Sequence, residues 1–415
     1  VGAALLAAIA LHRQRGGARS YEVKLDRGHV ATTVRSESFF RRGGQSAGAG
    51  FAPLSRFWRA ADGWVRTHAN YPWHRAALLR ALGTSDDAGD VAKALAEIPA
   101  VEVEERVFAA GGIAGAVRSL EAWRAHPQGR ALGEEPLIGH QMMGDAPPRR
   151  RTRADLPAEG VRVLDLTRVI AGPVCTRFMA ALGADVLRVD SPRQPDIRFG
   201  AVADTLLGKR SSLVDFAAPD GRATLDRLLD QADVVVHGYR PGALDPFGLR
   251  AESLAERHPG LVVVYLDAWG HRGPWAGRRG FDSIVQAPSG IAMGESGDGR
   301  EPGALPCQLL DHGTGYLAAA AVSDGLRRQA EQGGTHVRTL SLGRTAAWLT
   351  STPAQATPAS GDPDGGGLDP EPWMVELDSA GGPVGAVAPP GRLGGRPLSW
   401  RSPLTGYGTD PATWS

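Results

Sequence analysis

The chain has 415 residues, 42% of them hydrophobic and 22% charged, with 46 Lys and Arg against 45 Asp and Glu. This length predicts two or three domains, and the apolar share is enough for sizeable cores, which excludes a chain disordered throughout. The net charge of +1 argues against a nucleic-acid partner, because tracking phosphates needs a clear excess of basic residues.

The first segment, residues 1–11, is apolar. No basic residue precedes it and two arginines follow at once, so we expect a buried helix rather than a signal peptide or a membrane span. Because the sequence starts at Val1, inside this helical pattern, we expect further residues upstream.

The first unit, residues 1–143, reads as mainly helical. Helical periods occur at residues 73–82, 88–96, 101–110 and 114–125, with a hairpin-like section around residues 61–65. Residues 144–159 are polar, basic and contain prolines, and this composition predicts a linker.

Strands and helices alternate within residues 160–350. We expect strands at 161–165, 185–189, 233–236 and 261–266, and helices at 174–182, 223–231 and 251–257. This alternation implies an α/β fold with a Rossmann-like parallel sheet and helices on both faces, on which the largely helical first unit packs. Residues 351–372, rich in Pro and Gly, predict a flexible linker before a tail segment at 373–415.

An internal repeat relates residues 2–27 to residues 316–344. Both segments read as an Ala-rich helix with a basic end, a Gly-Gly turn and an alternating strand. The shared turns are Gly16-Gly17 and Gly333-Gly334. The repeat indicates parts of two related units, with chance similarity of Ala-rich helices as the alternative.

Cysteine and histidine usage limits the chemistry. The two cysteines, Cys175 and Cys307, cannot form a disulfide framework or a thiolate metal cluster. The histidines show no metal-ligand spacing. We therefore expect no metal and a reducing, cytoplasmic compartment.

Five motifs between Gly160 and about Trp348 resemble the class III CoA-transferase family, also called CaiB/BaiF, and follow in the family's order. They are GVRVLDLTRVIAGPVCTRFMAALGADVLRVDSP, LGKRSSLVDF, ADVVVHGYRPGALDPFGL, AWGHRGPWAGRRGFDSIVQAPSG and LLDHGTGYLAAAA. The first half resembles the family's later portion, at ADGWV and LEAWRAHPQGRAL. The resemblance implies the CoA-transferase family III fold in a tandem or permuted chain, the tail of one unit followed by the head of another.

The resemblance implies a CoA transferase that moves CoA between an acyl-CoA and a free carboxylic acid, with CoA as a substrate and no resident cofactor. In the family, an aspartate in the LLDHG segment forms a mixed anhydride with the acyl group and then an aspartyl-CoA thioester; here it is Asp311. Such a carboxylate needs partial desolvation and oxyanion donors. Gly313 and Gly315 follow it at a helix start, where N–H groups and the positive dipole end are available. The alternative is that Asp311 is a helix N-cap.

CoA carries phosphates, which are bound by basic side chains and by N–H groups on strand-to-helix loops. The resemblance implies CoA-binding residues in such loops: Arg168, Ala171, Gly172, Pro173, Arg188, Lys209, Arg210, Arg240 and Pro241. Lys209 stands out as one of only three lysines. For each arginine the alternative is a solvated surface charge.

Two alternative functions remain open. Acyl-CoA racemases of similar sequence carry histidine where Phe281 stands, and phenylalanine cannot accept a proton, so a racemase or isomerase is disfavoured unless His312 or His271 acts as the base. A non-catalytic CoA-binding paralogue is the second alternative, because the family's Gly-rich loop has no clear match. Ile170 and Ser191 also depart from the residues that some members use for acyl or CoA contacts.

The family forms interlocked dimers. The resemblance therefore implies either a homodimer or, since this chain holds parts of two units, a pseudo-dimeric monomer. We expect acyl-CoA and a carboxylic acid as partners, and no membrane association.

Overall fold

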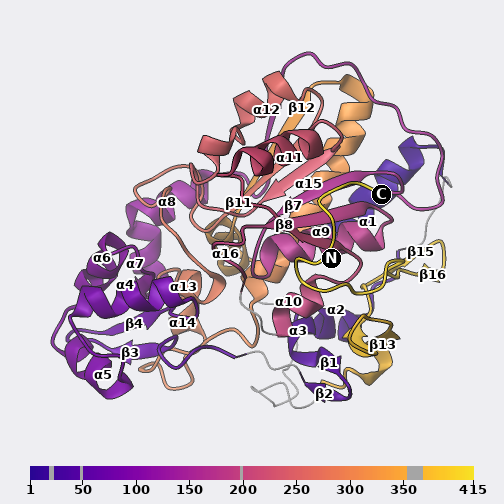
Figure 1. The fold of residues 1–415 in the computed structure, drawn as a ribbon. Coiled ribbons are helices and arrows are strands. Elements are labelled where there is room, and N and C mark those ends of the chain that lie inside the picture. The colour runs from indigo at the N-terminus through magenta and orange to yellow at the C-terminus, as the bar shows by residue number, and fades with distance from the viewer. Residues whose placement is uncertain (18–22, 47–49, 197–199, 353–367) are drawn as a thin grey trace.

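The structure, a computed structural model, describes residues 1–17, 23–46, 50–196, 200–352 and 368–415. A large domain is built on a seven-stranded sheet, and a smaller lobe on a three-stranded sheet stands beside it (Figure 1). Among the described helices none is long and apolar enough to cross a membrane.

The large sheet has the strand order β6-β12-β11-β10-β7-β8-β9. Its strands are β7 (Arg162–Leu166), β8 (Asp185–Asp190), β9 (Arg210–Leu213), β10 (Val234–His237), β11 (Val262–Asp267), β12 (Thr335–Ser341) and β6 (Gly139–Met143). All neighbours pair in parallel except β6, which is antiparallel to β12. The chain moves outward from β7 first to β8 and β9 and then to β10, β11 and β12, so the direction of winding reverses between β7 and β10.

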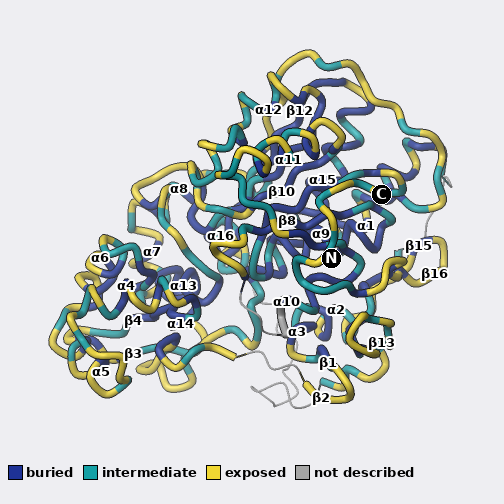
Figure 2. Tube along the Cα trace, viewed as in Figure 1, coloured by how far each residue is buried: buried dark blue, intermediate teal, exposed yellow. Residues whose placement is uncertain are grey.

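Helices cover both faces of this sheet, as expected for parallel strands with crossover helices. One face carries α1 (Gly2–Gln14), α9 (Ala171–Ala181) and α15 (Leu309–Gln332), and the other carries α11 (Pro219–Leu229) and α12 (Ala251–Arg257). Along β10, Val234 and Val236 belong to the first core and Val235 to the second. Figure 2 shows these central strands as buried. The Rossmann-like prediction is confirmed.

The smaller lobe combines both halves of the chain. It contains β3 (Phe57–Arg59), β4 (Trp64–Thr67), β5 (Ala114–Ala116), α4 (Pro72–Leu82), α5 (Ala88–Ala96), α6 (Ala100–Ala109), α7 (Leu120–Ala125), α13 (Asp282–Gln286) and α14 (Ile291–Gly294). The prediction of one helix over residues 114–125 is wrong. Residues 114–116 pair with β4 instead, because a tertiary strand partner overrides weak local propensity.

The helices of the repeat pack against each other. Leu5 and Ile9 of α1 share one core with Ala319 and Val322 of α15. The predicted strand of the first copy falls partly on residues 18–22, outside the described residues, and Val23–Asp26 are not in a strand. The second copy ends in β12 as expected.

Strands pair across the unit boundaries that were predicted from the sequence. β6, at the end of residues 1–143, is an edge strand of the large sheet, and the tail at 373–415 holds β13 (Met374–Leu377) and β14 (Val384–Val387). β14 pairs with β1 (Arg41–Arg42) of the first unit. The other elements are α2 (Arg27–Thr33), α3 (Ser36–Phe39), β2 (Gln45–Ser46), α8 (Pro127–Glu134), α10 (Gly200–Thr205), α16 (Leu342–Ser351), β15 (Arg392–Leu393), β16 (Arg396–Pro397) and the 3₁₀ turns Asp245–Phe247 and Glu371–Trp373.

Candidate active site

A cavity of about 540 Å³ opens at the carboxyl ends of the parallel strands. Arg168 follows β7, Tyr239 and Arg240 follow β10, and all three line the cavity. This edge, where the winding of the sheet reverses, is the usual ligand site of doubly wound sheets. The opposite wall comes from the smaller lobe, through the start of α4.

Asp311 lines this cavity from the first turn of α15, and only 5% of the residue is exposed. Its backbone N–H donates to Oδ2 of Asp282 over 3.0 Å, so the Asp282 side chain accepts one of the N–H groups at the start of the helix. The N-cap of α15 is Gln308, so Asp311 is not the N-cap. A Cβ added at Gly315 would lie 2.5 Å from the carbonyl oxygen of Ala171. Glycine at this position therefore lets α15 lie directly against the start of α9.

Three buried carboxyl groups interact here. Burial raises the pKa of Asp311 well above its usual value, and the neighbouring Asp282 and Glu37 raise it further. Burial also raises the pKa of Asp282 to about 6. Burial alone would raise the pKa of Glu37 as well, but His312, whose Nε2 lies 3.0 Å from Oε2 of Glu37, lowers it. The site thus holds Asp311 in a desolvated environment that favours its neutral form.

Four of the predicted CoA-binding residues line the cavity: Arg168, Ala171, Gly172 and Arg240. The Arg168 guanidinium lies 5.0 Å from the ring centre of Tyr71, and its Nη2 donates to the carbonyl oxygen of Pro195 over 2.8 Å. Arg240 is exposed. The β7–α9 turn and the loop after β10 therefore meet at one opening.

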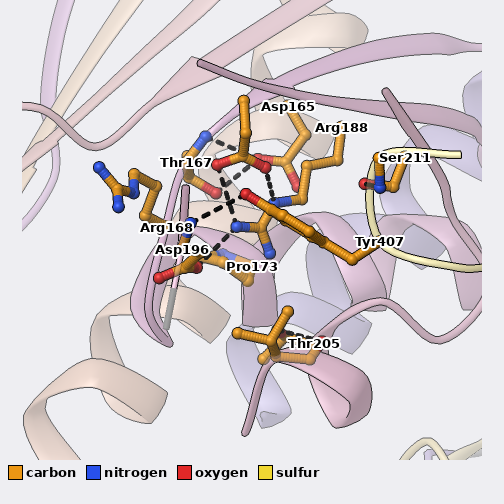
Figure 3. A network of polar contacts seen from close by, with 12 residues as sticks. Asp165, Thr167, Arg168, Pro173, Arg188, Asp196, Thr205, Ser211 and Tyr407 are labelled. Carbon is orange, nitrogen blue, oxygen red and sulfur yellow. Dashed lines mark hydrogen bonds and ion pairs between the residues drawn. The ribbon is translucent and has the colours of Figure 1, made fainter. Parts of the chain in front are cut away.

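Arg188 and Lys209 lie elsewhere, in a buried polar network. Figure 3 shows the part of this network around Arg188. Lys209 Nζ donates to Oδ2 of Asp165 and to the carbonyl oxygen of Pro173, each over 2.9 Å, and to Oγ1 of Thr176 over 2.6 Å. Neither basic side chain is exposed, and neither residue lines the cavity. Both side chains are buried, and carboxylates accept from Lys209 Nζ and from Nε and Nη2 of Arg188. We therefore assign both residues to the support of the turn rather than to ligand contact.

Arg210, Pro173 and Pro241 are also absent from the cavity lining. Arg210 begins the outermost strand β9, where its Nη2 donates to Oδ1 of Asp185 over 2.8 Å. Pro173 lies buried inside the first turn of α9, below the cavity surface. Arg210 therefore lies at the amino-terminal end of its strand, at the edge of the sheet opposite the cavity, and neither proline faces the cavity.

The wall from the smaller lobe was not anticipated. Tyr71, Trp73 and His74 line the cavity beside Phe281, whose ring stacks on His68 with centres 3.8 Å apart. Burial lowers the pKa of His68 to about 3 and that of His74 to about 4. The wall is therefore aromatic and uncharged near neutral pH. The signal in the sequence is the YPWH cluster at residues 71–74.

Two further arginines line the cavity, Arg278 and Arg279. Arg278 Nη2 donates to both carboxylate oxygens of Glu105, over 2.8 and 2.7 Å. Burial and the nearby Arg240 lower the pKa of Arg279. The RRGFD segment was considered only for Phe281, so its adjacent arginines were missed.

The histidines considered as alternative bases do not line the cavity. His312 is buried against Glu37, and Nε2 of His271 lies 3.3 Å from Oδ2 of Asp267. Phe281 does line it, and so does Ser191. Among the described residues no group of three or more His, Cys, Asp or Glu side chains could hold a metal ion.

Together these features define an α/β protein with a ligand cavity at the reversal point of a doubly wound sheet and a buried carboxyl group in its wall. The model of CoA-transferase family III matches residues 158–375. The chain belongs to this family.

Named relatives share part of the chain. An acyl-CoA transferase of Gibberella moniliformis is 31% identical over 66% of this chain and 52% of its own length. The probable fatty acyl-CoA transferase Rv3272 of Mycobacterium tuberculosis is 33% identical over 43% of this chain and 48% of its own. A crystal structure of Rv3272 aligns with a TM-score of 0.44 at 32% identity, covering 47% of this chain and 56% of that one. This chain thus spans about half the length of the curated relatives it matches.

Proposed function

We propose that the protein is a CoA transferase that moves CoA between an acyl-CoA and a free carboxylic acid, with Asp311 as the covalent nucleophile. The observation that carries this proposal is the desolvated Asp311 carboxyl group in the cavity wall, in the first turn of α15. Names of relatives such as succinate–glutarate CoA-transferase and formyl-CoA:oxalate CoA-transferase support the reaction class.

The reaction proceeds by exchange at carbonyl carbons. The Asp311 carboxylate attacks the carbonyl carbon of the thioester, the C–S bond breaks, and CoA departs as a thiolate, which leaves a mixed anhydride between the acyl group and Asp311. The thiolate then attacks the aspartyl carbonyl and releases the donor acid, which leaves an aspartyl-CoA thioester. The acceptor carboxylate attacks the aspartyl-CoA thioester, expels the CoA thiolate and forms a second mixed anhydride with Asp311. The thiolate then attacks the acceptor's carbonyl carbon, which releases the new acyl-CoA and regenerates the Asp311 carboxylate.

The residues around Asp311 support these steps. The first turn of α15 places positive partial charge beside the carboxyl group, which favours the negative tetrahedral intermediates. Arg168 and Arg240, at the cavity opening, suit the phosphates of CoA. Because Asp311 is buried, it is poorly hydrated once ionised and hence a better nucleophile than an exposed carboxylate.

One variant pair tests the proposal. Asp311→Asn keeps the volume and removes the nucleophile, whereas Asp145→Asn changes an exposed acid in the segment after β6. We expect Asp311→Asn to abolish CoA transfer from acetyl-CoA or succinyl-CoA to a panel of carboxylic acids, measured by chromatography, and Asp145→Asn to leave it unchanged. Retention of wild-type transfer by Asp311→Asn would refute the assignment.

A non-catalytic CoA-binding paralogue is the second candidate, and the acidic surroundings that favour neutral Asp311 support it. Calorimetric CoA binding without transfer to any acid in the panel would establish this alternative. Exchange of the α-hydrogen of an acyl-CoA with deuterated water, without an acceptor acid, would instead support a racemase.

We further propose that the chain works as a pseudo-dimeric monomer in a reducing cytoplasm. The packing of α1 on α15, the two helices of the repeat, supports this assembly. The two cysteines are free thiols. Analytical sedimentation is expected to give the mass of one chain, and the mass of two chains would favour the homodimer.

A further inference from the structure

The β7–α9 turn contains an unusual backbone conformation. Val169 has φ of 68°, and it is the only non-glycine residue with positive φ in the described chain. A β-branched residue in this left-handed region is strained, and such strain persists only where the surroundings enforce it. Val169 lines the cavity, next to Arg168 and two residues before the start of α9.

Two buried carboxylates, Asp165 and Asp196, accept hydrogen bonds from this turn. Both are drawn in Figure 3. Asp165 accepts from the backbone N–H of Thr167 over 3.0 Å and from its hydroxyl over 2.5 Å, before the strained residue. Asp196 accepts from the backbone N–H of Val169 itself over 3.2 Å. The Asp165 contact is local, whereas Asp196 is 27 residues away in the chain and belongs to the segment after β8.

Asp196 also joins three other parts of the fold. Its Oδ1 accepts from the Tyr71 hydroxyl over 2.6 Å, and its Oδ2 accepts from Nη2 of Arg188 over 2.7 Å. Its backbone N–H donates to the Tyr407 hydroxyl over 2.9 Å. Tyr71 comes from the smaller lobe and Tyr407 from the C-terminal tail, so the carboxylate that holds Val169 is itself fixed from several directions. Only 4% of Asp196 is exposed.

We propose that Asp196 is a positioning residue that holds Val169 in its left-handed conformation and thereby sets the first turn of α9 at the cavity. Ala171 and Gly172 of that turn line the cavity, and the first N–H groups of a helix have no intrahelical acceptor and are free to bind an anion. The effect of Asp196 on CoA transfer rests on the proposed function. The effect of Asp196 on the conformation of the turn is independent of that function.

The decisive comparison uses two acids that share a partner. Asp190 and Asp196 each accept from Arg188 over 2.7 Å, but no hydrogen bond joins Asp190 to Val169. Arg188 donates two hydrogen bonds to Asp190 and one to Asp196, so Asp190→Ala damages the Arg188 pairing at least as much as Asp196→Ala does. Asp196→Ala alone removes the acceptor of the Val169 N–H, together with that of the Tyr71 hydroxyl. Tyr71→Phe, which loses only the hydroxyl contact, is therefore the second control, and an effect on the turn beyond both controls isolates the proposed role.

Amide hydrogen exchange measures the hold on the turn in the whole protein. We expect the exchange rate of the Val169 amide hydrogen to rise at least tenfold more in Asp196→Ala than in Asp190→Ala. A tenfold change corresponds to the loss of about one hydrogen bond to a charged group. Asp196→Asn, which keeps the volume and a weaker acceptor, is expected to lie between wild type and Asp196→Ala, and it serves if the alanine variant does not fold. Equal exchange in the Asp196 and Asp190 variants would overturn the proposal.

Rescue by glycine tests the link to function. Glycine adopts positive φ without strain, so Val169→Gly should restore the turn in the Asp196→Ala background. We expect Asp196→Ala to lower kcat/KM for CoA transfer, or CoA affinity by calorimetry, about tenfold, and Val169→Gly to recover most of this loss. A loss that Val169→Gly leaves unchanged would overturn the positioning role. If wild type shows no transfer, the proposed reaction fails, while hydrogen exchange and CoA affinity still decide the role of Asp196.

Discussion

Replacing Lys209 by Met tests whether the buried network supports the cavity. Methionine keeps the length of the side chain but removes the charge and the donors to Asp165, Thr176 and Pro173. Lys209 and Asp165 are both fully buried, so the substitution leaves an unpaired carboxylate. Removing one partner of such a pair costs about 3–5 kcal/mol. In a domain of roughly 200 residues this cost lowers Tm by about 6–20 °C.

The matched control is Lys93→Met. The Lys93 side chain is 84% exposed and its Nζ lies 3.8 Å from Asp90, so its loss should change stability by less than about 1 kcal/mol. Calorimetric melting of both variants, with the double variant Lys209→Met/Asp165→Asn, measures the coupling. We expect the double variant to recover part of the stability, because no unpaired charge remains.

Two results would refute this reasoning. If Lys209→Met has the same Tm as Lys93→Met, the buried pair of Lys209 and Asp165 contributes nothing to the stability of the fold. If Lys209→Met instead keeps the wild-type Tm and weakens CoA binding, Lys209 contacts the ligand, as the sequence resemblance implied.

Three further predictions concern the cavity. Asp282→Asn removes a like charge from Asp311 and lowers its pKa, so the rise of kcat/KM with pH should move to lower pH in a pH-rate profile. Because the pKa of Asp282 is raised to about 6, the folded state binds more protons than the unfolded state between pH about 4 and 6. Stability should therefore fall as pH rises through this window, and denaturant titrations of Asp282→Asn should show a smaller fall. Arg240→Ala removes an exposed side chain and should weaken CoA binding about tenfold by calorimetry, with unchanged Tm; an equal effect at high salt would contradict a phosphate contact. Phe281→Ala removes the stack on His68 and should cost about 2 kcal/mol in urea unfolding; a cost near zero would show that the stack does not hold the wall.

The sheet of the second half could be predicted from sequence because its signals are local. Runs such as residues 233–236 are short, β-branched and bounded by polar turns, and the structure has β10 at Val234–His237. The alternation of strands and helices indicates a parallel sheet, in which the carboxyl ends of the strands lie at the same edge. Arg168, Gly172 and Arg240 were implied by the resemblance, and in the structure all three line the cavity at this edge.

The buried positions of Arg188 and Lys209 could not be predicted, because a charge looks solvated until its partners are known. Lys209 is paired with Asp165, 44 residues away, and Arg188 with Asp196, eight residues away beyond a turn. Only the folded sheet brings these groups together. Burial of a charge depends on such partners and not on local sequence.

The wall formed by Tyr71, Trp73 and His74 depends on how the smaller lobe sits against the sheet. Aromatic residues at helical spacing usually form a core, and nothing in their neighbourhood shows that this cluster faces a cavity. The strained Val169 was equally hidden, since valine gives no signal for positive φ. Both features arise from tertiary contacts, among them the bond from Tyr71 to Asp196.

Covalent trapping at Asp311 tests the central claim most directly. The wild-type protein and Asp311→Asn would be incubated with an acyl-CoA, treated with hydroxylamine, digested and analysed by mass spectrometry. We expect a hydroxamate at Asp311 in the wild-type peptide that contains the start of α15, and none in the variant. Turnover of acyl-CoA and acid by the wild-type protein without any modification at Asp311 would contradict it.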